Sequence, residues 1–374
     1  MDIKEARTRK EKQAFIKFPF LLYENDPLWV PPLLGEMRKI VQCSKSPLFQ
    51  SGPHTFYLAL EGRRVLGRIA VGVDEKFNRL RNKREGYITL FECVNNREVA
   101  VALFASAEEW LKKHNVSAFV GPLSPTNGDD FRGLLIENFE DSPLIFTPYN
   151  PPWYKDFFEK YGFERYHTFV AYRYNLEQMP FESYQRAIEY AKHKFGFAIR
   201  PIDYGQFERE VRAIQSILEK SLISLEYDYL APPAVEELSL MAKEFKRFIP
   251  PSFAQIAWVG EEPVGFAVAI PDYNQVIKKM KGKLFPLGWL TFLLNKHRID
   301  WGRAFLLFVI PQYQGKGIPA ALLWEIFKEG CKRGYVFAEG SSINTKNVKM
   351  CREAESLGGV PYKKFALYKK AIEL

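Results

Sequence analysis

Within fifteen residues, 305–319, the chain reads Phe-Leu-Leu-Phe-Val-Ile-Pro-Gln-Tyr-Gln-Gly-Lys-Gly-Ile-Pro. The first six residues form an unbroken apolar run rich in aromatic and branched side chains, which predicts a strand buried on both faces. Gln312 to Gly317 then follow the pattern Gln-x-x-Gly-x-Gly, and apolar residues recur at helical spacing as far as Gly334. Glycines at a helix N-terminus let a ligand approach the backbone closely and meet unpaired N–H groups. The stretch therefore predicts an anion site of the kind that holds a pyrophosphate.

This strand, turn and helix together resemble the acyl-CoA-binding motif of the GCN5-related N-acetyltransferase (GNAT) superfamily, with Gln312, Gly315 and Gly317 on the matching positions. The resemblance implies that amides of the loop hold the CoA pyrophosphate, and that the preceding strand splays from its neighbour to admit the pantetheine arm. A Walker-type P-loop is excluded, because Gly-x4-Gly-Lys-Ser/Thr occurs nowhere in the sequence. The implied cofactor-binding residues are Val309, Ile310, Gln312, Gln314, Gly315, Lys316, Gly317 and Ile318.

The composition bounds the class of protein. At 374 residues the chain is long enough for two domains, and no run approaches the ~18–20 apolar residues that span a bilayer. Because the charged N-terminus lacks a signal-peptide core, we expect a cytoplasmic protein. The four cysteines are far apart and have no histidine at ligand spacing, so we expect reduced thiols and no metal site. The net charge of +9 suits CoA, a phospholipid headgroup or nucleic acid, without choosing among them.

The same order of elements occurs twice along the chain. A helix, an alternating hairpin, a strand and a second helix in the first half have counterparts in the second half. Gly162 with Gly358, and Tyr172 with Tyr368, are both offset by 196 residues. The repeat predicts an α+β fold of two tandem GNAT-like domains, each with a mixed, mostly antiparallel sheet flanked by helices. The expected domains are a degenerate one over 1–180, a helical linker over 181–196 and an acyl-CoA-binding one over 197–374.

The two halves differ at the loop that follows the motif strand. Where the second half has the glycines of residues 312–317, the first half has Val94-Asn-Asn-Arg-Glu-Val-Ala, which contains none. Side chains at every position block the close approach of a ligand to the backbone. We therefore expect the first half not to bind CoA there, and to be a degenerate copy that supports the other half or shapes the acceptor site.

Residues 121–154 have no counterpart in the second half. The segment is long and turn-rich, and it combines carboxylates with aromatic residues. Long ordered loops of this kind often form a lid or part of a binding site. Two readings stay open: a surface excursion in which Asp129 and Asp130 form a solvated turn, or an acceptor-amine site at the interface of the halves, contacted by Asp129, Asp130 or Asn150.

Residues 278–298 are a second insertion, placed before the motif strand. Basic clusters flank an apolar core at 284–294, which is too short to span a bilayer. Pro286 and Gly288 argue against one regular helix. Packing of the aromatic residues onto the domain is one reading, and contact with a long acyl chain or peripheral contact with a membrane surface is the other.

Acyl transfer from CoA to an amine needs amides that polarise the thioester carbonyl, a base for the ammonium proton and, in some enzymes, an acid for the thiolate. In the GNAT superfamily a backbone N–H of the motif strand holds the carbonyl, which implies residues 308–310 here. The acid is often a tyrosine seven residues after an asparagine and four before Gly-Phe. Asn347 and Gly358 fit that frame, but Ala354 stands at the tyrosine position. The thiolate then leaves unassisted, or a tyrosine from elsewhere, Tyr362 or Tyr368, serves.

The base has no candidate on the motif strand, which carries no carboxylate. By topology the best candidates are Glu339, at the end of the next strand, and Asp272, which ends the hairpin. Each can also be read as a structural or solvated carboxylate. Asn344 and Asn347 are candidates to hydrogen-bond the pantetheine amides, as the asparagine of the superfamily does. The catalytic candidates are thus Glu339, Asp272 and Tyr362.

The sequence therefore predicts an N-acyltransferase whose second half binds acetyl-CoA or another acyl-CoA and passes the acyl group to a small-molecule or lipid amine. Two alternatives stay open. One is a long-chain acyltransferase acting on an amino-lipid, suggested by residues 278–298, and the other is a non-catalytic acyl-CoA- or lipid-binding protein, suggested by Ala354. A nucleic-acid partner has only the net charge in its favour, and we expect none. The two-domain layout also resembles a group of bacterial GNAT-like proteins of uncertain substrate.

Overall fold

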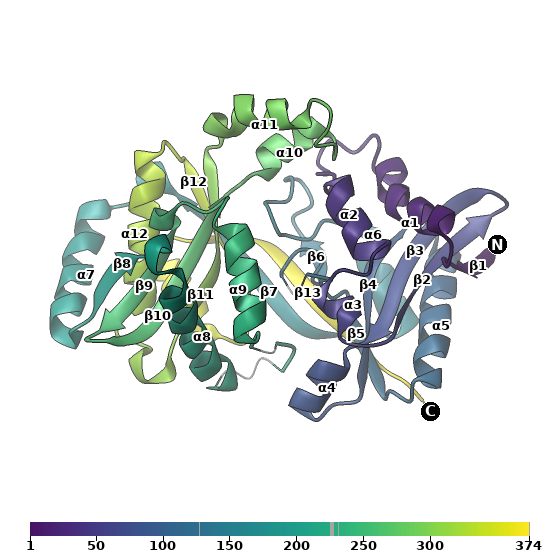
Figure 1. Ribbon diagram of the computed structural model, residues 1–374, viewed down its shortest axis with the longest axis horizontal. Coiled ribbons are helices and arrows are strands. Elements are labelled where there is room, and N and C mark those ends of the chain that lie inside the picture. Colours follow the sequence, from purple (N-terminus) through teal and green to yellow (C-terminus); the bar gives the residue numbers. More distant parts are fainter. Residues whose placement is uncertain (127, 225–227, 231, 374) are drawn as a thin grey trace. The chain divides into compact units, whose positions relative to one another are not determined.

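The computed structural model of the chain describes residues 1–126, 128–224, 228–230 and 232–373. The fold is α+β, as predicted, with helices packed on the faces of mixed sheets (Figure 1). The chain divides into two compact units, each of which gathers separate stretches of sequence. Unit 1 contains Met1–Phe169, Tyr273–Arg298 and Lys363–Leu374, and unit 2 contains Val170–Asp272 and Ile299–Tyr362.

Unit 1 is built on a sheet with the strand order β1-β2-β3-β4-β5-β13, and β6 also pairs with β13. Neighbouring strands are antiparallel except β4 and β5, which are parallel. Its strands are β1 (Asp2–Glu5), β2 (His54–Glu61), β3 (Arg64–Val73), β4 (Glu85–Cys93), β5 (Ala118–Gly121), β6 (Leu134–Glu137) and the part of β13 (Val360–Ala371) from Lys363. Its helices are α1 (Arg9–Leu22), α2 (Leu34–Val41), α3 (Pro47–Gln50), α4 (Glu75–Arg81), α5 (Arg97–Lys113), α6 (Trp153–Tyr161), α10 (Asn274–Met280) and α11 (Gly288–Asn295).

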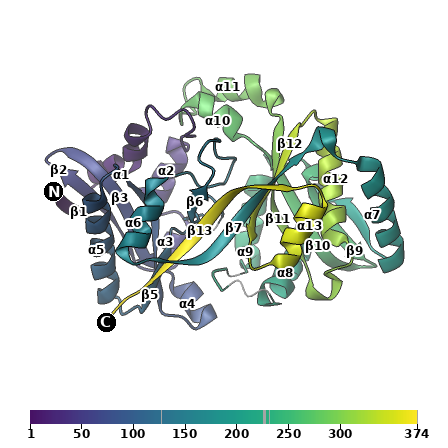
Figure 2. The ribbon, with the colours of Figure 1, turned by 180° about the vertical axis from the view of Figure 1, so that it is seen from behind.

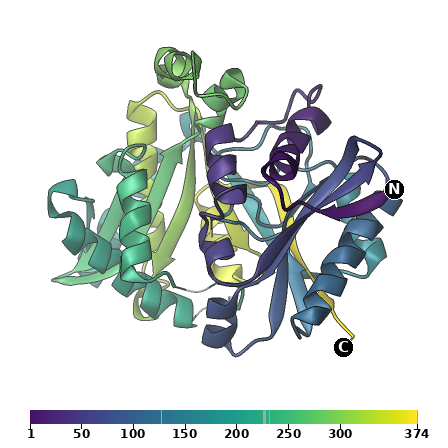
Figure 3. The same ribbon diagram turned by 45° about the vertical axis from the view of Figure 1, so that its right-hand side comes forward.

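The sheet of unit 1 separates two apolar cores. Alternation along β2 and β3 sends Ile69 and Val71 toward α5 and α6, and Phe56 and Leu58 toward α1 and α2. Figure 3 shows the purple helices α1 and α2 and the blue α5 on opposite sides of these strands. The predicted β2–β3 hairpin is thus confirmed, with both of its faces covered.

Unit 2 has a sheet with the strand order β7-β12-β11-β10-β9-β8. Helix α8, with α9 beside it, packs on one face, and α12 packs on the other between α7 and α13 (Figures 1 and 2). Its strands are the part of β7 (Glu164–Asn175) from Val170, β8 (Ala198–Pro201), β9 (Ala254–Val259), β10 (Glu262–Pro271), β11 (Trp301–Val309) and β12 (Phe337–Asn344). Its helices are α7 (Phe181–Phe195), α8 (Phe207–Ser224), α9 (Val235–Phe245), α12 (Ile318–Lys332) and α13 (Val348–Ser356).

The internal repeat extends to the hydrogen-bond register. Gly67 on β3 pairs with Cys93 on β4, and Gly265 on β10 pairs with Val309 on β11. Val94 then donates its N–H to the carbonyl oxygen of Leu66, and Ile310 donates its N–H to that of Val264, both at 2.9 Å. A bulge interrupts both ladders a few residues further along. The motif strand β11 therefore has a structural counterpart in β4.

The last strands of the two halves are distributed across the units in an unexpected way. β13, at the end of the chain, pairs with β5 in unit 1 through Tyr368↔Gly121, whereas β7, at the end of the first half, pairs with β12 in unit 2. Compact units and sequence repeats therefore do not coincide. The predicted domain boundaries at 180 and 197 describe the repeat and stay a prediction, and the expected helical linker is occupied by α7.

Candidate active site

Strands β11 and β12 run side by side only at their beginnings. Their parallel register extends from Trp301↔Phe337 to Ala304↔Gly340 and then stops, although both strands continue. β11 meanwhile stays paired with β10 as far as Val309. The two strands therefore diverge in the plane of the sheet beyond Ala304, as the resemblance implied for the strands that admit pantetheine.

The divergence changes the burial of the motif strand. Residues 305–308 are only half-buried, so the prediction of a strand buried on both faces is wrong for this part. The physical reason is that β12 no longer lies alongside to cover them. In β4, the counterpart in unit 1, every residue from Gly86 to Cys93 is buried. The second half thus has a partly exposed apolar surface on β11, whereas the corresponding surface of β4 in the first half is buried.

The direction of the backbone amides singles out one of the predicted strand residues. Ile310 donates its N–H to the carbonyl oxygen of Val264 at 2.9 Å. Successive N–H groups of an antiparallel strand alternate in direction, so the Val309 N–H points away from β10, toward the side from which β12 has diverged. Gln314 also donates from Nε2 to the Val309 carbonyl oxygen at 3.3 Å, which ties the loop to the strand end. Of the two predicted residues, Val309 therefore has the better-placed donor.

The loop after β11 has the geometry of an anion site. Gly315 and Gly317 have φ angles of +74° and +76°, in the left-handed region that favours glycine. Gly317 is the N-cap of α12, and no side chain caps the helix from that position. The space where a Cβ of Gly315 would lie is open, with no atom within 4 Å. Ligand oxygens can therefore approach the amides of residues 315–318, and Lys316 adds a positive charge beside them.

A carboxylate shares this helix N-terminus. Ala320 donates its N–H to Glu353 Oε1 of α13 at 3.2 Å. Burial raises the pKa of Glu353, and the hydrogen bond from Ala320 opposes that rise. The carboxyl group therefore satisfies one amide of α12 and leaves the earlier ones to a ligand.

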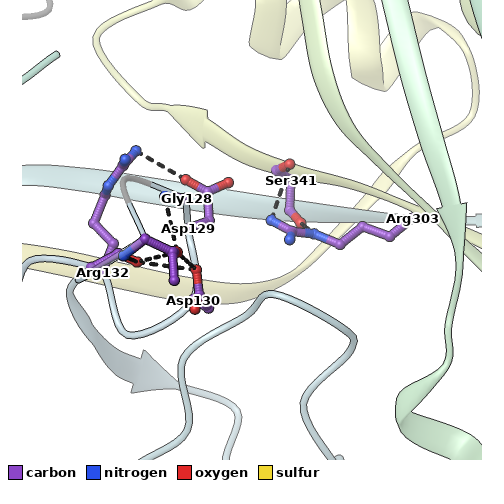
Figure 4. A network of polar contacts seen from close by, with 8 residues as sticks. Gly128, Asp129, Asp130, Arg132, Arg303 and Ser341 are labelled. Atoms are coloured by element: carbon purple, nitrogen blue, oxygen red, sulfur yellow. Dashed lines mark hydrogen bonds and ion pairs between the residues drawn. The ribbon is translucent and has the colours of Figure 1, made fainter. Parts of the chain in front are cut away.

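A buried polar cluster lies where β11 and β12 are still paired. Arg303 and Glu339 are register partners, and both are fully buried. Arg303 Nε donates to Ser341 Oγ at 2.8 Å (Figure 4), and it lies 3.5 Å from Glu339 Oε1. Glu339 also accepts hydrogen bonds from the hydroxyls of Ser341 and Tyr362. Two predicted catalytic residues, Glu339 and Tyr362, are thus brought into direct contact, and both carboxylate oxygens are engaged.

Asp272 lies on the same face of the sheet as this cluster. It follows the pair Pro271↔Gly302, and its N–H donates to the carbonyl oxygen of Trp301 at 2.9 Å. Because Ile270 pairs with Arg303 and side chains repeat every two residues, Asp272 shares the face of Arg303 and Glu339. Asp272 is also buried. The three predicted catalytic residues therefore belong to one face of unit 2.

Comparisons with known proteins agree with this geometry. Residues 220–354 match the model described as the acetyltransferase (GNAT) family. The second half of the chain therefore carries a domain of the GNAT family. A tandem GNAT protein from the clavulanic acid biosynthesis pathway has a similar fold, with a TM-score of 0.58, 12% identity, and coverage of 100% of this chain and 99% of that chain. The predicted tandem GNAT fold is therefore confirmed.

Two curated relatives are similar over nearly their whole length. Protein YghO of Escherichia coli (strain K12) is 29% identical over 372 residues, which cover 97% of this chain and 94% of that protein. A protein named bacterial ceramide synthase, from Caulobacter vibrioides (strain NA1000 / CB15N), is 26% identical over 374 residues, which cover 98% of this chain and 96% of that protein.

The asparagines expected to bind pantetheine have local structural roles. Asn344, at the end of β12, accepts the N–H of Lys346 on Oδ1 at 3.0 Å, and Asn347 caps α13 by accepting the N–H of Met350 at 3.1 Å. Both lie at the turn between β12 and α13. Their role toward the CoA of a GNAT enzyme stays a prediction.

One residue near the diverging strands was missed by the sequence reasoning. Tyr174 of β7 is 1% exposed, and within the described part of the chain its hydroxyl has no hydrogen-bond partner. Its ring borders Gly340, the last residue of β12 that pairs with β11, and Gly359, which follows α13. Burial raises the pKa of Tyr174 well above its usual range, so the hydroxyl stays protonated. No local sequence pattern pointed to it, because it comes from the strand at the end of the first half.

The corresponding place in the first half is filled by protein. Cys93, the register counterpart of Val309, donates its N–H to Tyr154 Oη at 2.7 Å, and Tyr154 Oη donates to the Cys93 carbonyl oxygen at 3.0 Å. Asn96 caps α5 with its side chain, at the place where α12 has a glycine. These contacts support the expectation that the first half does not bind CoA, which stays a prediction.

The long loop of residues 121–154 is held by its own polar groups. Asn150 bonds both backbone groups of Leu135, at 2.7 and 3.1 Å, which is a structural role. Asp130 accepts hydrogen bonds from Ser124 and Thr126, and Asp129 pairs with Arg132 at 3.0 Å (Figure 4). The reading in which Asp129 and Asp130 form a solvated turn is wrong, because both residues are partly buried. Their role toward an acceptor amine stays open.

Proposed function

We propose that the protein transfers a long acyl chain from CoA to the primary amine of an amino-lipid. The observation that carries the proposal is the apolar, half-buried surface of residues 305–308, which begins where β12 leaves β11 and leads to the glycine loop. The phenylalanine and leucine side chains of residues 305–308 can cover a fatty acyl chain, whereas an acetyl group would contact little of this surface. The relative named bacterial ceramide synthase supports the same choice, because a ceramide is an N-acylated long-chain amino-alcohol.

The acyl-CoA would lie along β11 with its pyrophosphate at the loop. The amides of residues 315–318, the N-terminus of α12 and Lys316 would hold the phosphates. From Val309 back to Ala304 is five residues, roughly 17 Å at about 3.3 Å each, over which an extended acyl chain can follow the strand. With the thioester near Val309, the acyl chain would therefore point toward the place where β11 and β12 meet.

The reaction joins the amine nitrogen to the thioester carbonyl carbon, and the C–S bond breaks. The N–H of Val309 is the group best placed to polarise the carbonyl oxygen. The ammonium must first lose a proton, for which we propose Asp272, the predicted carboxylate that is buried on the same face as Arg303. We propose that Glu339 and Tyr362 hold the Arg303 side chain in position. We also propose that the Tyr174 hydroxyl protonates the departing thiolate.

The test is an acyl-transfer assay in detergent micelles. Sphinganine as the amine and palmitoyl-CoA as the donor are expected to give free CoA thiol and the N-acyl product, identified by mass spectrometry. Acetyl-CoA with the same amine is expected to react at least about tenfold more slowly, because it cannot use the apolar surface of β11. Faster turnover with acetyl-CoA, or thiol release without an amide, would overturn the long-chain proposal.

A further inference from the structure

Residues 284–294 concentrate exposed apolar side chains. Among the described residues, nearly half of the exposed large apolar side chains fall in these eleven positions, and Phe285 is 74% and Leu287 67% exposed. Isolated exposed apolar residues are ordinary, but a contiguous group marks an interaction surface. The members of this platform are Leu284, Phe285, Leu287, Trp289, Leu290, Leu293 and Leu294.

The platform is a folded part of unit 1. Val276 and Met280 of α10 are buried beneath it, and the carbonyl oxygen of Gly282 accepts the N–H of Leu34 at 3.0 Å. Lys278 Nζ donates to Ser142 Oγ at 2.9 Å. The segment is therefore anchored to unit 1 while these apolar residues stay exposed (α11, at the top of Figure 1).

The segment that carries the platform has charges of one sign. Between Tyr273 and Ile299 the sequence contains no aspartate or glutamate. Its cations lie on both sides of residues 284–294, and all but Lys278 are exposed. The basic residues are Lys278, Lys279, Lys281, Lys283, Lys296 and Arg298.

We propose that residues 278–298 dock the protein on the surface of an anionic phospholipid bilayer. The apolar side chains would enter the boundary between headgroups and acyl chains, and the lysines would meet the lipid phosphates. Each cation near such a surface is attracted to it electrostatically, which a neutral protein partner would not provide. Among the described residues no helix is long and apolar enough to cross a bilayer, so this contact is peripheral. The proposal stands independently of the acyl acceptor, although it would place the enzyme where an amino-lipid is found.

Sedimentation with vesicles tests the proposal. The full chain is expected to sediment with phosphatidylcholine vesicles containing one-third phosphatidylserine, to sediment much less with pure phosphatidylcholine, and to be released by high salt. Phe285→Glu/Leu294→Glu is expected to lower the partition coefficient at least about tenfold, since it removes two apolar insertions and adds two negative charges. The matched control is Leu80→Glu/Leu240→Glu, at two exposed leucines outside the platform, and it should bind vesicles like the wild type.

Two results would overturn the proposal. One is the absence of binding to anionic vesicles, or an equal loss of binding in both double variants. The other is sedimentation-velocity data in which the wild type self-associates through the platform while ignoring vesicles, which would make a second copy the partner. Acyl transfer in detergent micelles is measured separately, and Phe285→Glu/Leu294→Glu should retain it, so a failure of docking and a failure of the proposed reaction give different results.

Discussion

At the scale of single residues, the proposed reaction centre combines groups that different parts of the chain contribute. Val309 and Gly315 belong to the glycine motif and its strand, whereas Tyr174 comes from β7 and Arg303 from the strand start. The buried Arg303–Glu339 pair is held by Ser341 and Tyr362, so each charge is compensated. Loss of one partner would leave the other charge buried and unpaired, which typically destabilises a protein by about 3–5 kcal/mol.

Tyr174→Phe separates a catalytic role from a structural one. The Tyr174 hydroxyl is buried without a hydrogen-bond partner among the described residues, so its removal should leave the free energy of unfolding unchanged or raise it by about 1 kcal/mol. If the hydroxyl protonates the thiolate, kcat should fall about 100-fold while the KM for acyl-CoA stays the same. Thermal unfolding and steady-state kinetics measure the two effects. Tyr184→Phe, which loses a hydrogen bond to Ser356, is the control, and an unchanged kcat in Tyr174→Phe would remove this residue from the mechanism.

At the scale of elements, the N-terminus of α12 has to serve both a ligand and a carboxylate. Glu353 accepts the N–H of Ala320, and its pKa is raised by burial. Because the pKa of the folded state lies above the unfolded value, the stability contributed by the protonated group is lost as pH rises through the folded pKa. In the same range the carboxylate becomes negative and begins to repel a pyrophosphate bound at the helix.

Affinity for CoA should therefore fall as pH rises through the raised pKa of Glu353. The expected decrease is about two- to fivefold, as for a charge placed at a helix terminus. Glu353→Gln keeps an oxygen for the Ala320 N–H and removes the charge, so its CoA affinity should exceed that of the wild type at neutral pH. Glu329→Gln, near the C-terminus of α12, is the control. Calorimetric titrations at several pH values give the comparison, and parallel pH profiles for Glu353→Gln and the wild type would contradict the assignment.

The element scale also shows what the sequence could predict. The strand-loop-helix of residues 305–332 and the hairpins follow from local patterns, and all of them form. The half-burial of residues 305–308 was not predictable from composition, because it results from β12 turning away. Tyr174 was missed for a similar reason, since the pairing of β7 with β12 joins residues far apart in sequence.

At the scale of the whole molecule, one fold occurs twice, and within the described residues the two copies differ at the place of the proposed site. Both copies retain an equivalent glycine pair, Gly67↔Cys93 in the first and Gly265↔Val309 in the second, and a bulge that follows it. In the first copy the Tyr154 hydroxyl holds both backbone groups of Cys93, and in the second the corresponding amide faces the diverging strands. We therefore expect one acyl-CoA site per chain, at the loop of the second copy.

Calorimetric titration with palmitoyl-CoA tests this claim most directly, using two matched glycine variants. Gly315 and Gly334 have φ angles of +74° and +78°, and neither has an atom within 4 Å of a built Cβ, so an alanine at either position should cost a similar ~1 kcal/mol of strain. The account predicts a stoichiometry of one, an affinity at least about tenfold weaker in Gly315→Ala, and unchanged binding in Gly334→Ala. Two sites per chain, or equal affinities in the two variants, would contradict it.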